Sequence, residues 1–225
     1  MPAFLSIVIP TLNSTKTIAP TLMSLSEGIT TGLIKELIIS DGNSTDAINE
    51  MCEEIGAILI KGKRGRGIQL HRGAMQAKGE WILFIHSDTM LPSGWTDAFL
   101  NHIKTGKNAG YCKLSFDDAS IKAKIISAGA NLRSKYLKLP YGDQCLLISK
   151  KLYKEIGGYP NLSIMEDVSI AKLLKHKLQL IPIDVKTSAR KYQNEGWIKR
   201  SIKNIILVLK FKFGADPEKL AKSYK

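Results

Sequence analysis

The chain has little of what extracellular, zinc-knuckle and membrane-spanning proteins depend on. Its 225 residues include only three cysteines, which lie far apart and lack paired spacing. Such a set builds neither a disulfide framework nor a zinc knuckle, and it favours a reducing compartment, the cytoplasm. The longest apolar stretch, residues 205–213, is interrupted by Lys210 and Lys212 and is far shorter than the roughly 20 residues of a membrane helix. The apolar residues 4–10 are too few for a signal peptide, so none is expected.

Negative charge is also scarce. The chain has 20 Asp and Glu residues against 33 Lys and Arg residues, a formal net charge of +13 at pH 7. This excess indicates an anionic partner, such as nucleotide phosphates, anionic lipid or nucleic acid. There is no recognition-helix motif and no aromatic ribonucleoprotein signature, so nucleic acid is not expected. The lysines concentrate after Lys186, where an anionic membrane surface is a reasonable partner.

The chain does have a regular alternation of strand and helix patterns over residues 1–91. Short apolar runs at residues 6–10, 36–40, 57–61 and 81–85 have the composition of buried parallel strands. Helical patterns with short connections separate these runs. This alternation is the signature of a parallel, doubly wound sheet, here in a single α/β domain.

Each of these runs ends in polar or glycine-rich residues. Residues 11–15 follow the first run, Asp41 follows the second, residues 62–67 follow the third and residues 86–89 follow the fourth. Because parallel strands point the same way, these groups are expected to gather at one edge of the sheet, where open α/β sheets bind ligands. A lone strand-end Asp88 would more simply cap its turn, and it is the convergence that favours a site.

The second half of the chain is less regular. We predict helices at residues 95–104, 121–139, 165–176 and 197–213, and strands at residues 110–116, 145–149 and 178–185. In the first half, Ser44 or Thr45 is expected to cap a helix whose inner face includes Ile48, Cys52 and Ile55.

Several motifs occur together in a recognisable order. They are SIVIPTLN at residues 6–13, DGNSTD at residues 41–46, HSDT at residues 86–89 and MEDVSI at residues 165–170. Together they resemble the inverting glycosyltransferases of family 2 with the GT-A fold. KRGRGIQLHRGA at residues 63–74, FIHSDTMLP and YGDQ at residues 141–144 resemble a small soluble bacterial branch of that family.

The resemblance implies a fold and a division of labour. The fold would be of GT-A type, with a Rossmann-like, mostly parallel sheet flanked by helices. Residues 1–91 would form the nucleotide-sugar-binding half, and residues 92–225 the acceptor half with a C-terminal helix. The donor would be a nucleotide-diphosphate sugar, most simply a UDP-sugar.

The donor site implied by the resemblance combines the loops after the first two strands with later polar residues. Pro10, Thr11 and Asn13 would line the base and ribose. Asp41 would accept a hydrogen bond from the base, which suits an imide N–H such as that of uracil. The remaining nucleotide-binding residues would be Arg66, Gln69, His86, Ser87 and Asp88. Of these, Arg66 and Gln69 follow a glycine-rich turn at a helix start, a place suited to phosphate.

A divalent cation, Mg²⁺ or Mn²⁺, is implied as cofactor, with Asp88 as its ligand. Family members commonly carry Asp-x-Asp where this chain has His86-Ser87-Asp88, and an acidic residue where it has Ser14. His86 could bind the metal, and we favour a ribose-facing or structural role for it instead.

The base that deprotonates the acceptor hydroxyl is assigned to Asp167 by the resemblance, with Glu166 beside it. Helix physics alone would explain both carboxylates as favourable charges at a helix N-terminus. Adjacent helical residues point about 100° apart, so at most one of them faces the donor squarely. Asp143 and Gln144 are expected to contact the acceptor or to support the site from behind.

The expected function is therefore inverting transfer of a sugar to an acceptor hydroxyl by metal-assisted direct displacement. One alternative is a nucleotidyltransferase, which would normally need a glycine-rich basic loop where this chain has PTLNSTK. Another is a basic protein of the same fold that binds a nucleotide sugar or a membrane surface without catalysis.

The acceptor is not identified, and a lipid-linked one is among the candidates. Apolar residues of the closing segment, residues 197–213, form a broad stripe beside lysines. We favour packing of this stripe on the domain. The alternative is a helix that lies on an anionic leaflet and brings the site to a lipid-linked acceptor.

Overall fold

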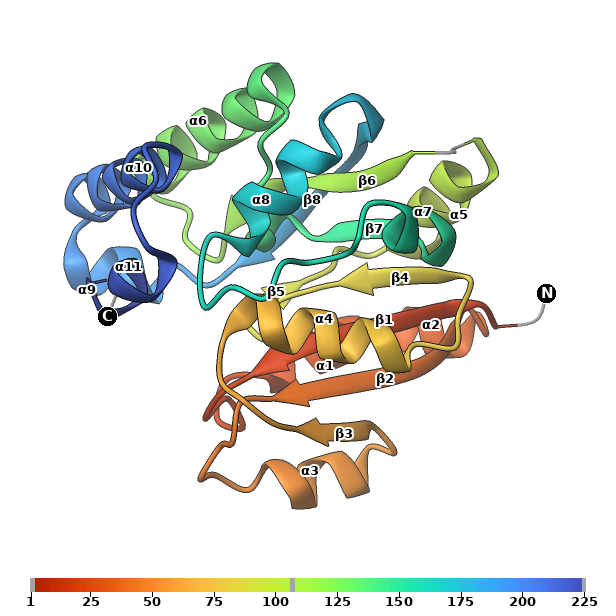
Figure 1. The fold of residues 1–225 in the computed structure, drawn as a ribbon. Helices are drawn as coiled ribbons and strands as arrows, with labels where there is room; N and C mark the ends of the chain where they lie inside the picture. The colour runs from red at the N-terminus through yellow and green to blue at the C-terminus, as the bar shows by residue number, and fades with distance from the viewer. Residues whose placement is uncertain (1–2, 106–107, 224–225) are drawn as a thin grey trace.

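A computed structural model describes residues 3–105 and 108–223 as one mixed sheet with helices on both faces (Figure 1). The strands are β1 (Leu5–Thr11), β2 (Ile34–Asp41), β3 (Ile58–Lys61), β4 (Trp81–Phe84), β5 (Thr89–Met90), β6 (Ala109–Phe116), β7 (Leu146–Ser149) and β8 (Leu178–Thr187). The first-half helices are α1 (Ala19–Ser24), α2 (Ser26–Thr30), α3 (Ile48–Glu54), α4 (Arg66–Gln76) and α5 (Trp95–Thr105). The later helices are α6 (Ile121–Leu137), α7 (Lys150–Glu155), α8 (Glu166–Leu173), α9 (Arg190–Glu195), α10 (Trp197–Lys212) and α11 (Pro217–Ser223), with short 3₁₀ helices η1 (Gly142–Gln144) and η2 (Lys175–Lys177).

The sheet has the strand order β3-β2-β1-β4-β7-β6-β8-β5. Strands β1 to β4 are parallel, and Ile7 of β1 lies opposite Leu37 of β2 and Leu83 of β4. Beyond β4, β7 is antiparallel, β6 and β8 are parallel to each other, and β5 is antiparallel to β8. The mostly parallel sheet is as predicted. The order reverses between β1 and β4, and such a switch point is where α/β sheets bind ligands.

Alternation along the strands divides the core between the two faces of the sheet. Ile7 and Ile9 of β1 pack with Trp95 and Phe99 of α5 on one face. Val8 belongs to the core on the other face, which α4, α7 and α8 cover. Burial of such a side chain stabilises the fold by roughly 1.5–3 kcal/mol.

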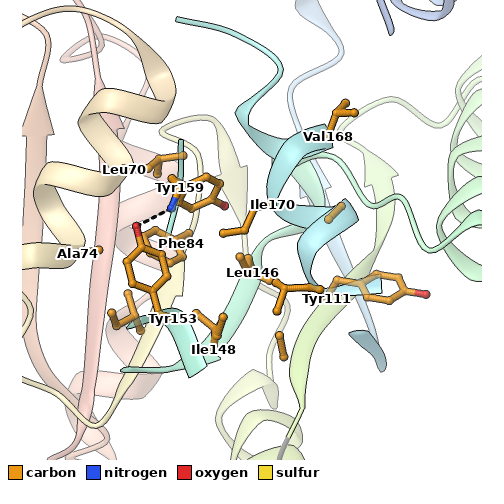
Figure 2. Packing of buried hydrophobic residues seen from close by; sticks show 14 of the residues in the cluster. Leu70, Ala74, Phe84, Tyr111, Leu146, Ile148, Tyr153, Tyr159, Val168 and Ile170 are labelled. Carbon is orange, nitrogen blue, oxygen red and sulfur yellow. Dashed lines mark hydrogen bonds between the residues drawn. The ribbon is translucent and has the colours of Figure 1, made fainter. Parts of the chain in front are cut away.

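The α4 face is packed closely enough to fix where α4 begins. Figure 2 shows Leu70 of α4 near Phe84, Tyr153 and Tyr159, and the Tyr153 hydroxyl accepts a hydrogen bond from the Tyr159 backbone N–H at 3.0 Å. A Cβ atom on Gly73 would lie 2.5 Å from Cγ1 of Val8, so only glycine lets α4 approach β1 this closely. The α4 start is thereby held at the carboxyl edge of the sheet.

The expected helix cap at Ser44 or Thr45 is wrong. Helix α3 begins at Ile48, and its N-cap residue Ala47 offers no side-chain cap. Ser44 bonds to Asp41 instead, and the Thr45 N–H donates to Oδ1 of Asn13 at 2.9 Å. Ser44 and Thr45 therefore join the ends of β1 and β2, and neither caps α3.

Among the described residues, no helix is both long and apolar enough to cross a bilayer.

Candidate active site

Two adjoining cavities open at the carboxyl ends of β1 and β4. The β1 cavity, of about 500 Å³, is lined by Pro10, Thr11, residues 64–66, Ser87 and others. The α8 cavity, of about 110 Å³, is lined by Tyr141, Gly142, Asp143, Asp167 and residues of α10. The two cavities share five lining residues, namely Arg66, His86, Asp88, Ile164 and Lys191. Segments far apart in the sequence thus meet at the predicted edge.

Asp41 anchors the floor of this site and is not part of the wall of the β1 cavity. Its side chain is fully buried, and its Oδ1 atom accepts hydrogen bonds from the hydroxyls of Thr11 at 2.9 Å and Ser44 at 2.5 Å. Its Oδ2 atom accepts from the Ser44 N–H at 2.7 Å. The contacts that Asp41 makes therefore fix the loops after β1 and β2, and contact with a base remains a prediction.

Asn13 is held in the left-handed region, with φ of 51°, by the same network. Its N–H donates to the Ser44 hydroxyl at 2.8 Å. Asn13 borders a third hollow, which it shares with Ser87 and Asp88. Asp46 holds the next turn by accepting from the N–H and hydroxyl of Thr15 at 2.9 and 2.8 Å, the anchoring role that its position indicates.

Gln69 joins three segments at the edge of the sheet. Its Nε2 atom donates to the carbonyls of Thr11 at 2.7 Å and Ser40 at 2.9 Å, and its Oε1 atom accepts from the Gly65 N–H at 3.2 Å. Both amide hydrogens are engaged, so Gln69 orders the turn in this structure. Gln69 also lines the β1 cavity, and its expected contact with phosphate stays a prediction.

The start of α4 also differs from the expected phosphate site. The backbone N–H of Arg66 donates to the Ser163 carbonyl at 3.2 Å, and that of Gly67 donates to the Leu162 carbonyl at 3.0 Å. A Cβ atom on Gly67 would lie 2.6 Å from the Pro160 carbonyl, so glycine is needed for this approach. The first N–H groups of α4 therefore hold the segment before α8, and an anion would be met by side chains instead.

An ion pair joins the start of α4 to the start of α8. Nε of Arg66 donates to Oε1 of Glu166, which is fully buried, while the Arg66 side chain is 29% exposed and faces both cavities. Among the described residues, Oε2 of Glu166 has no hydrogen-bond partner. Burial raises the pKa of Glu166 to about 7, although Arg66 opposes the shift. Glu166 thus holds Arg66 in the wall between the cavities.

This buried carboxyl predicts a pH dependence of stability that Glu166→Gln removes. The folded-state pKa is raised from 4.5 to about 7, so the contribution of Glu166 is fully present below 4.5 and is lost as pH rises through about 7. The free energy of unfolding of the wild type, relative to Glu166→Gln, should fall on the order of 3 kcal/mol from about pH 5 to 8. Urea denaturation of both proteins across this range measures it. The variant Glu54→Gln, at an exposed position, is the matched control. If the difference in free energy of unfolding from the wild type did not change with pH for either variant, the raised pKa of Glu166 would be contradicted.

Asp167 lies at the start of α8 with its carboxylate half-exposed in the α8 cavity. Its Oδ2 atom accepts from the Gly142 N–H at 3.1 Å, and its Oδ1 atom from the Val168 N–H at 2.8 Å. These bonds fix the carboxylate in the cavity wall. Glu166 instead turns toward Arg66, as expected for neighbours on one helix.

Asp143 stands beside Asp167 and Asp88 in the same cavity. Its Oδ1 atom is enclosed and, among the described residues, has no hydrogen-bond partner. Burial raises the pKa of Asp143 to about 6; Arg133 opposes this shift, whereas Asp167 and Asp88 add to it. Three carboxylates therefore share one small space, which favours a cation or a proton there.

At the end of β4 the neutral form of the His86 imidazole is favoured. Burial lowers its pKa well below the ordinary value, and the charges of Arg66 and Lys191 act in the same direction. A Cβ atom on Gly142 would lie 2.4 Å from Nε2 of His86, so the ring packs directly against this glycine. Nε2 has no hydrogen-bond partner among the described residues.

Gln144 supports the site from behind, which is one of the two roles expected of it. It is fully buried, and its Oε1 atom accepts from the Ser134 hydroxyl at 2.5 Å and from Nη2 of Arg133 at 3.1 Å. Its Nε2 atom donates to the Cys112 carbonyl at 3.1 Å. Arg133 in turn lies 3.4 Å above the ring of Tyr141, and this stacking fixes a wall of the α8 cavity.

The carboxylates at this site fit a divalent cation that takes most of its ligands from substrate phosphates and water. The described residues contain no cluster of three His, Cys, Asp or Glu side chains able to enclose a metal alone. Asp88 lines both cavities, and Asp143 lines the α8 cavity. Mg²⁺ is typically bound by one or two carboxylates, with water and substrate phosphates as the other ligands.

Part of the α8 cavity was not anticipated from the sequence. Its outer wall is formed by α9 and α10, through Lys191, Tyr192, Arg200 and Asn204. Arg200 is 3% exposed and pairs with Glu195 at 2.7 Å. Arg200 and Asn204 are spaced i, i+4, which places them on one helix face, and this spacing was a usable signal.

Comparison with known proteins identifies the class to which this fold and site belong. The profile of glycosyl transferase family 2 matches residues 6–153, so the chain belongs to this family and is a glycosyltransferase. No protein with curated function matches the sequence.

Solved structures of similar fold include glucosyl-3-phosphoglycerate synthase from Mycobacterium tuberculosis in complex with Mn²⁺, UDP and glucosyl-3-phosphoglycerate. Its TM-score is 0.63 at 19% identity, over 95% of this chain and 81% of that one. Another is S. aureus TarS, residues 1–349, in complex with UDP-GlcNAc, with a TM-score of 0.65 at 16% identity over 100% of this chain and 71% of that one. At these identities the likeness shows the fold, which is the expected GT-A fold.

Proposed function

We propose that the protein transfers a sugar from a UDP-sugar to an acceptor hydroxyl, with inversion at the anomeric carbon. One observation carries the proposal: Arg66, Asp88 and Asp167 come from three distant segments and meet at two adjoining cavities. The choice of UDP is supported by the UDP complexes of both structural neighbours. Residues 1–91 would hold the donor, and residues 92–225 would supply most of the acceptor side.

The nucleotide would occupy the β1 cavity. Pro10 and Thr11 line it, and the network of Asp41 and Ser44 keeps their loop in place. Arg66 faces the space between the two cavities, where a diphosphate joined to a sugar would lie. Its guanidinium suits phosphate oxygens, and Glu166 prevents it from swinging away.

Asp88 would hold a divalent cation, Mg²⁺ or Mn²⁺, with Asp143 close by. A divalent cation held there would supply positive charge to offset the negative charge that develops on the leaving diphosphate. Asp88 lines both cavities and so places a carboxylate at their border. His86 and Ser87 complete this strand end, and the neutral His86 ring against Gly142 fits our preference for a structural or ribose-facing role.

Asp167 would act as the base on the acceptor side. As the acceptor oxygen attacks the anomeric carbon, its proton passes to the Asp167 carboxylate and the bond from the sugar to UDP breaks. A single displacement inverts the anomeric centre, and no covalent enzyme intermediate is formed. The Gly142 and Val168 N–H groups hold the carboxylate in place for this step.

A thermal-shift series tests the nucleotide site. UDP with Mn²⁺ should raise the melting temperature, because ligand at about 100 times its dissociation constant adds about 2.7 kcal/mol of stability. Arg66→Gln should reduce the shift, whereas the control Lys63→Gln, which lies outside the cavity wall, should not. Equal increases in melting temperature with UDP, GDP and ADP would contradict selection of the base by the loop after β1. A shift from none of them would overturn the nucleotide site itself.

A further inference from the structure

The outer face of α10 and its C-terminal end carry an apolar stripe that is largely exposed in the described chain. Its members recur every three or four residues and are exposed, up to 90% for Phe213: Ile198, Ile202, Ile205, Ile206, Leu209 and Phe213. The opposite face, with Arg200, Leu207 and Val208, is the buried one. The expectation that the apolar stripe packs on the domain is therefore wrong for Ile198, Ile202, Ile205, Ile206 and Leu209, whereas Trp197 packs against Phe116. An exposed apolar face of this extent marks an interaction surface.

Helix α6, which contacts α10, carries a second stripe of the same kind (Figure 1). Ile121, Ile125, Leu132 and Tyr136 are each more than half exposed. They lie opposite the buried Ala123, Ala130 and Ser134. Two neighbouring helices thus share the same unusual pattern.

The charges beside these stripes indicate which kind of partner fits them best: a second copy of the chain, nucleic acid or a lipid bilayer. Neither helix contains Asp or Glu, and Lys203 of α10 pairs with Glu195 of α9. The other lysines that flank the stripes are Lys199, Lys210 and Lys212 on α10, and Lys122, Lys124 and Lys135 on α6. A second copy of the chain would bring lysine against lysine with no carboxylate between them. Nucleic acid would pair with the lysines and leave the aliphatic side chains without a partner. An anionic bilayer satisfies both, since its phosphates meet lysine while the acyl boundary receives the apolar stripe.

We propose that α10 and α6 dock this protein on an anionic lipid bilayer. A shallow hollow of about 440 Å³ at the end of α10, lined by Ile206, Leu209, Phe213 and Ala215 among others, offers space for part of an acyl chain. This binding goes beyond the transfer reaction and requires no nucleotide.

The docking face is physically tied to the candidate active site. The inner face of α10 contributes Arg200, Asn204 and Val208 to the wall of the α8 cavity. Only the diameter of one helix, about 10 Å, therefore separates the lipid surface from that cavity. A protein held in this way meets acceptors that the bilayer presents.

Vesicle sedimentation of the full chain tests the proposal. Vesicles of phosphatidylcholine with about 30% phosphatidylglycerol should bind the protein. Vesicles of phosphatidylcholine alone should bind it at least about tenfold more weakly. The triple variant Ile202→Asn, Leu209→Asn, Phe213→Asn should lose about tenfold or more in binding to the anionic vesicles. Its matched control replaces exposed apolar residues elsewhere: Met23→Asn, Ile29→Asn and Met75→Asn. Circular dichroism and the UDP thermal shift verify that each variant is folded.

The charge arm uses Lys199→Gln, Lys210→Gln and Lys212→Gln, with Lys35→Gln, Lys151→Gln and Lys154→Gln as a control of equal charge. The α10 set should weaken binding to the anionic vesicles by about tenfold or more, and added salt should do the same to the wild type. Equal losses in both sets would reduce the effect to net charge and overturn the proposed face. No binding to anionic vesicles at any salt concentration would overturn it too, as would a dimer that only the apolar variant abolishes.

Discussion

Replacing Asp167 with asparagine should leave UDP binding unchanged and lower sugar transfer by about 10²–10⁴-fold, the usual contribution of a positioned base. Asparagine keeps the shape and can still accept from the Gly142 and Val168 N–H groups that hold the aspartate. What it loses is the ability to take the acceptor proton. Titration with UDP and Mn²⁺ beside transfer kinetics separates the two effects. A parallel loss of UDP affinity and transfer would make Asp167 a binding or structural residue.

Glu166→Gln is the matched comparison for this experiment. The two carboxylates are adjacent in the sequence, but Glu166 is buried against Arg66, whereas Asp167 faces the α8 cavity. Glu166→Gln should therefore raise the KM for the donor through Arg66 and cost less in kcat than Asp167→Asn. If Glu166→Gln lowered kcat more, the base would be Glu166.

Asp88→Asn should lower metal-dependent turnover by about 10²-fold or more while the protein stays folded, because electrostatic stabilisation of the leaving group is usually the largest catalytic contribution. Asp88 stands at the border of the β1 and α8 cavities, and asparagine there removes the charge that holds the cation. Part of the activity should return at high Mn²⁺ concentration. Turnover as a function of Mn²⁺ and Mg²⁺ concentration measures both.

Two further variants make this result specific. Asp97→Asn removes an exposed carboxylate at the start of α5 and should change nothing. His86→Asn should do less harm than Asp88→Asn, since the imidazole packs on Gly142 and is neutral. An equal loss of turnover in His86→Asn would indicate that the imidazole is a metal ligand. Full activity of Asp88→Asn at low metal concentration would show that Asp88 is not the metal ligand.

The first half of the fold was predictable because its central strands, β1 and β4, are buried on both faces. A strand such as β4, residues Trp81–Phe84, reads as a continuous apolar run, and its polar end follows at once. Short elements left no such signal. Strand β5 has two residues and helices α7 and α9 have six each, fewer than the periodicity of a helix requires.

The site was predictable in its location and less so in its contacts. Asp88 and Asp167 share a cavity, as the convergence of strand ends and the motif order implied. The pairing of Arg66 with Glu166 joins residues 100 positions apart, and nothing local in the sequence encodes it. Gln69 has the residue type of a ligand contact, but the carbonyls at the ends of β1 and β2 take its donors.

The orientation of α10 was the largest error, and its cause is physical. Its residues show a periodic apolar stripe, and such a stripe normally faces the core. Here Arg200, Leu207 and Val208 occupy the buried face, and the wider stripe faces outward. The periodicity of apolar residues shows which of them share a helix face, but it does not show whether that face packs on the domain or lies exposed.

Proton NMR of the sugar released from an α-linked UDP-hexose tests direct displacement at this site most directly. With Mn²⁺ and no acceptor, water takes the place of the acceptor hydroxyl, and the hemiacetal can be observed before it mutarotates. We expect the β-anomer to appear first from UDP-glucose or UDP-GlcNAc, and to be lost in Asp88→Asn. Initial release of the α-anomer would contradict inversion. Absence of release from every UDP-sugar at enzyme concentrations equal to the donor would contradict the transferase site.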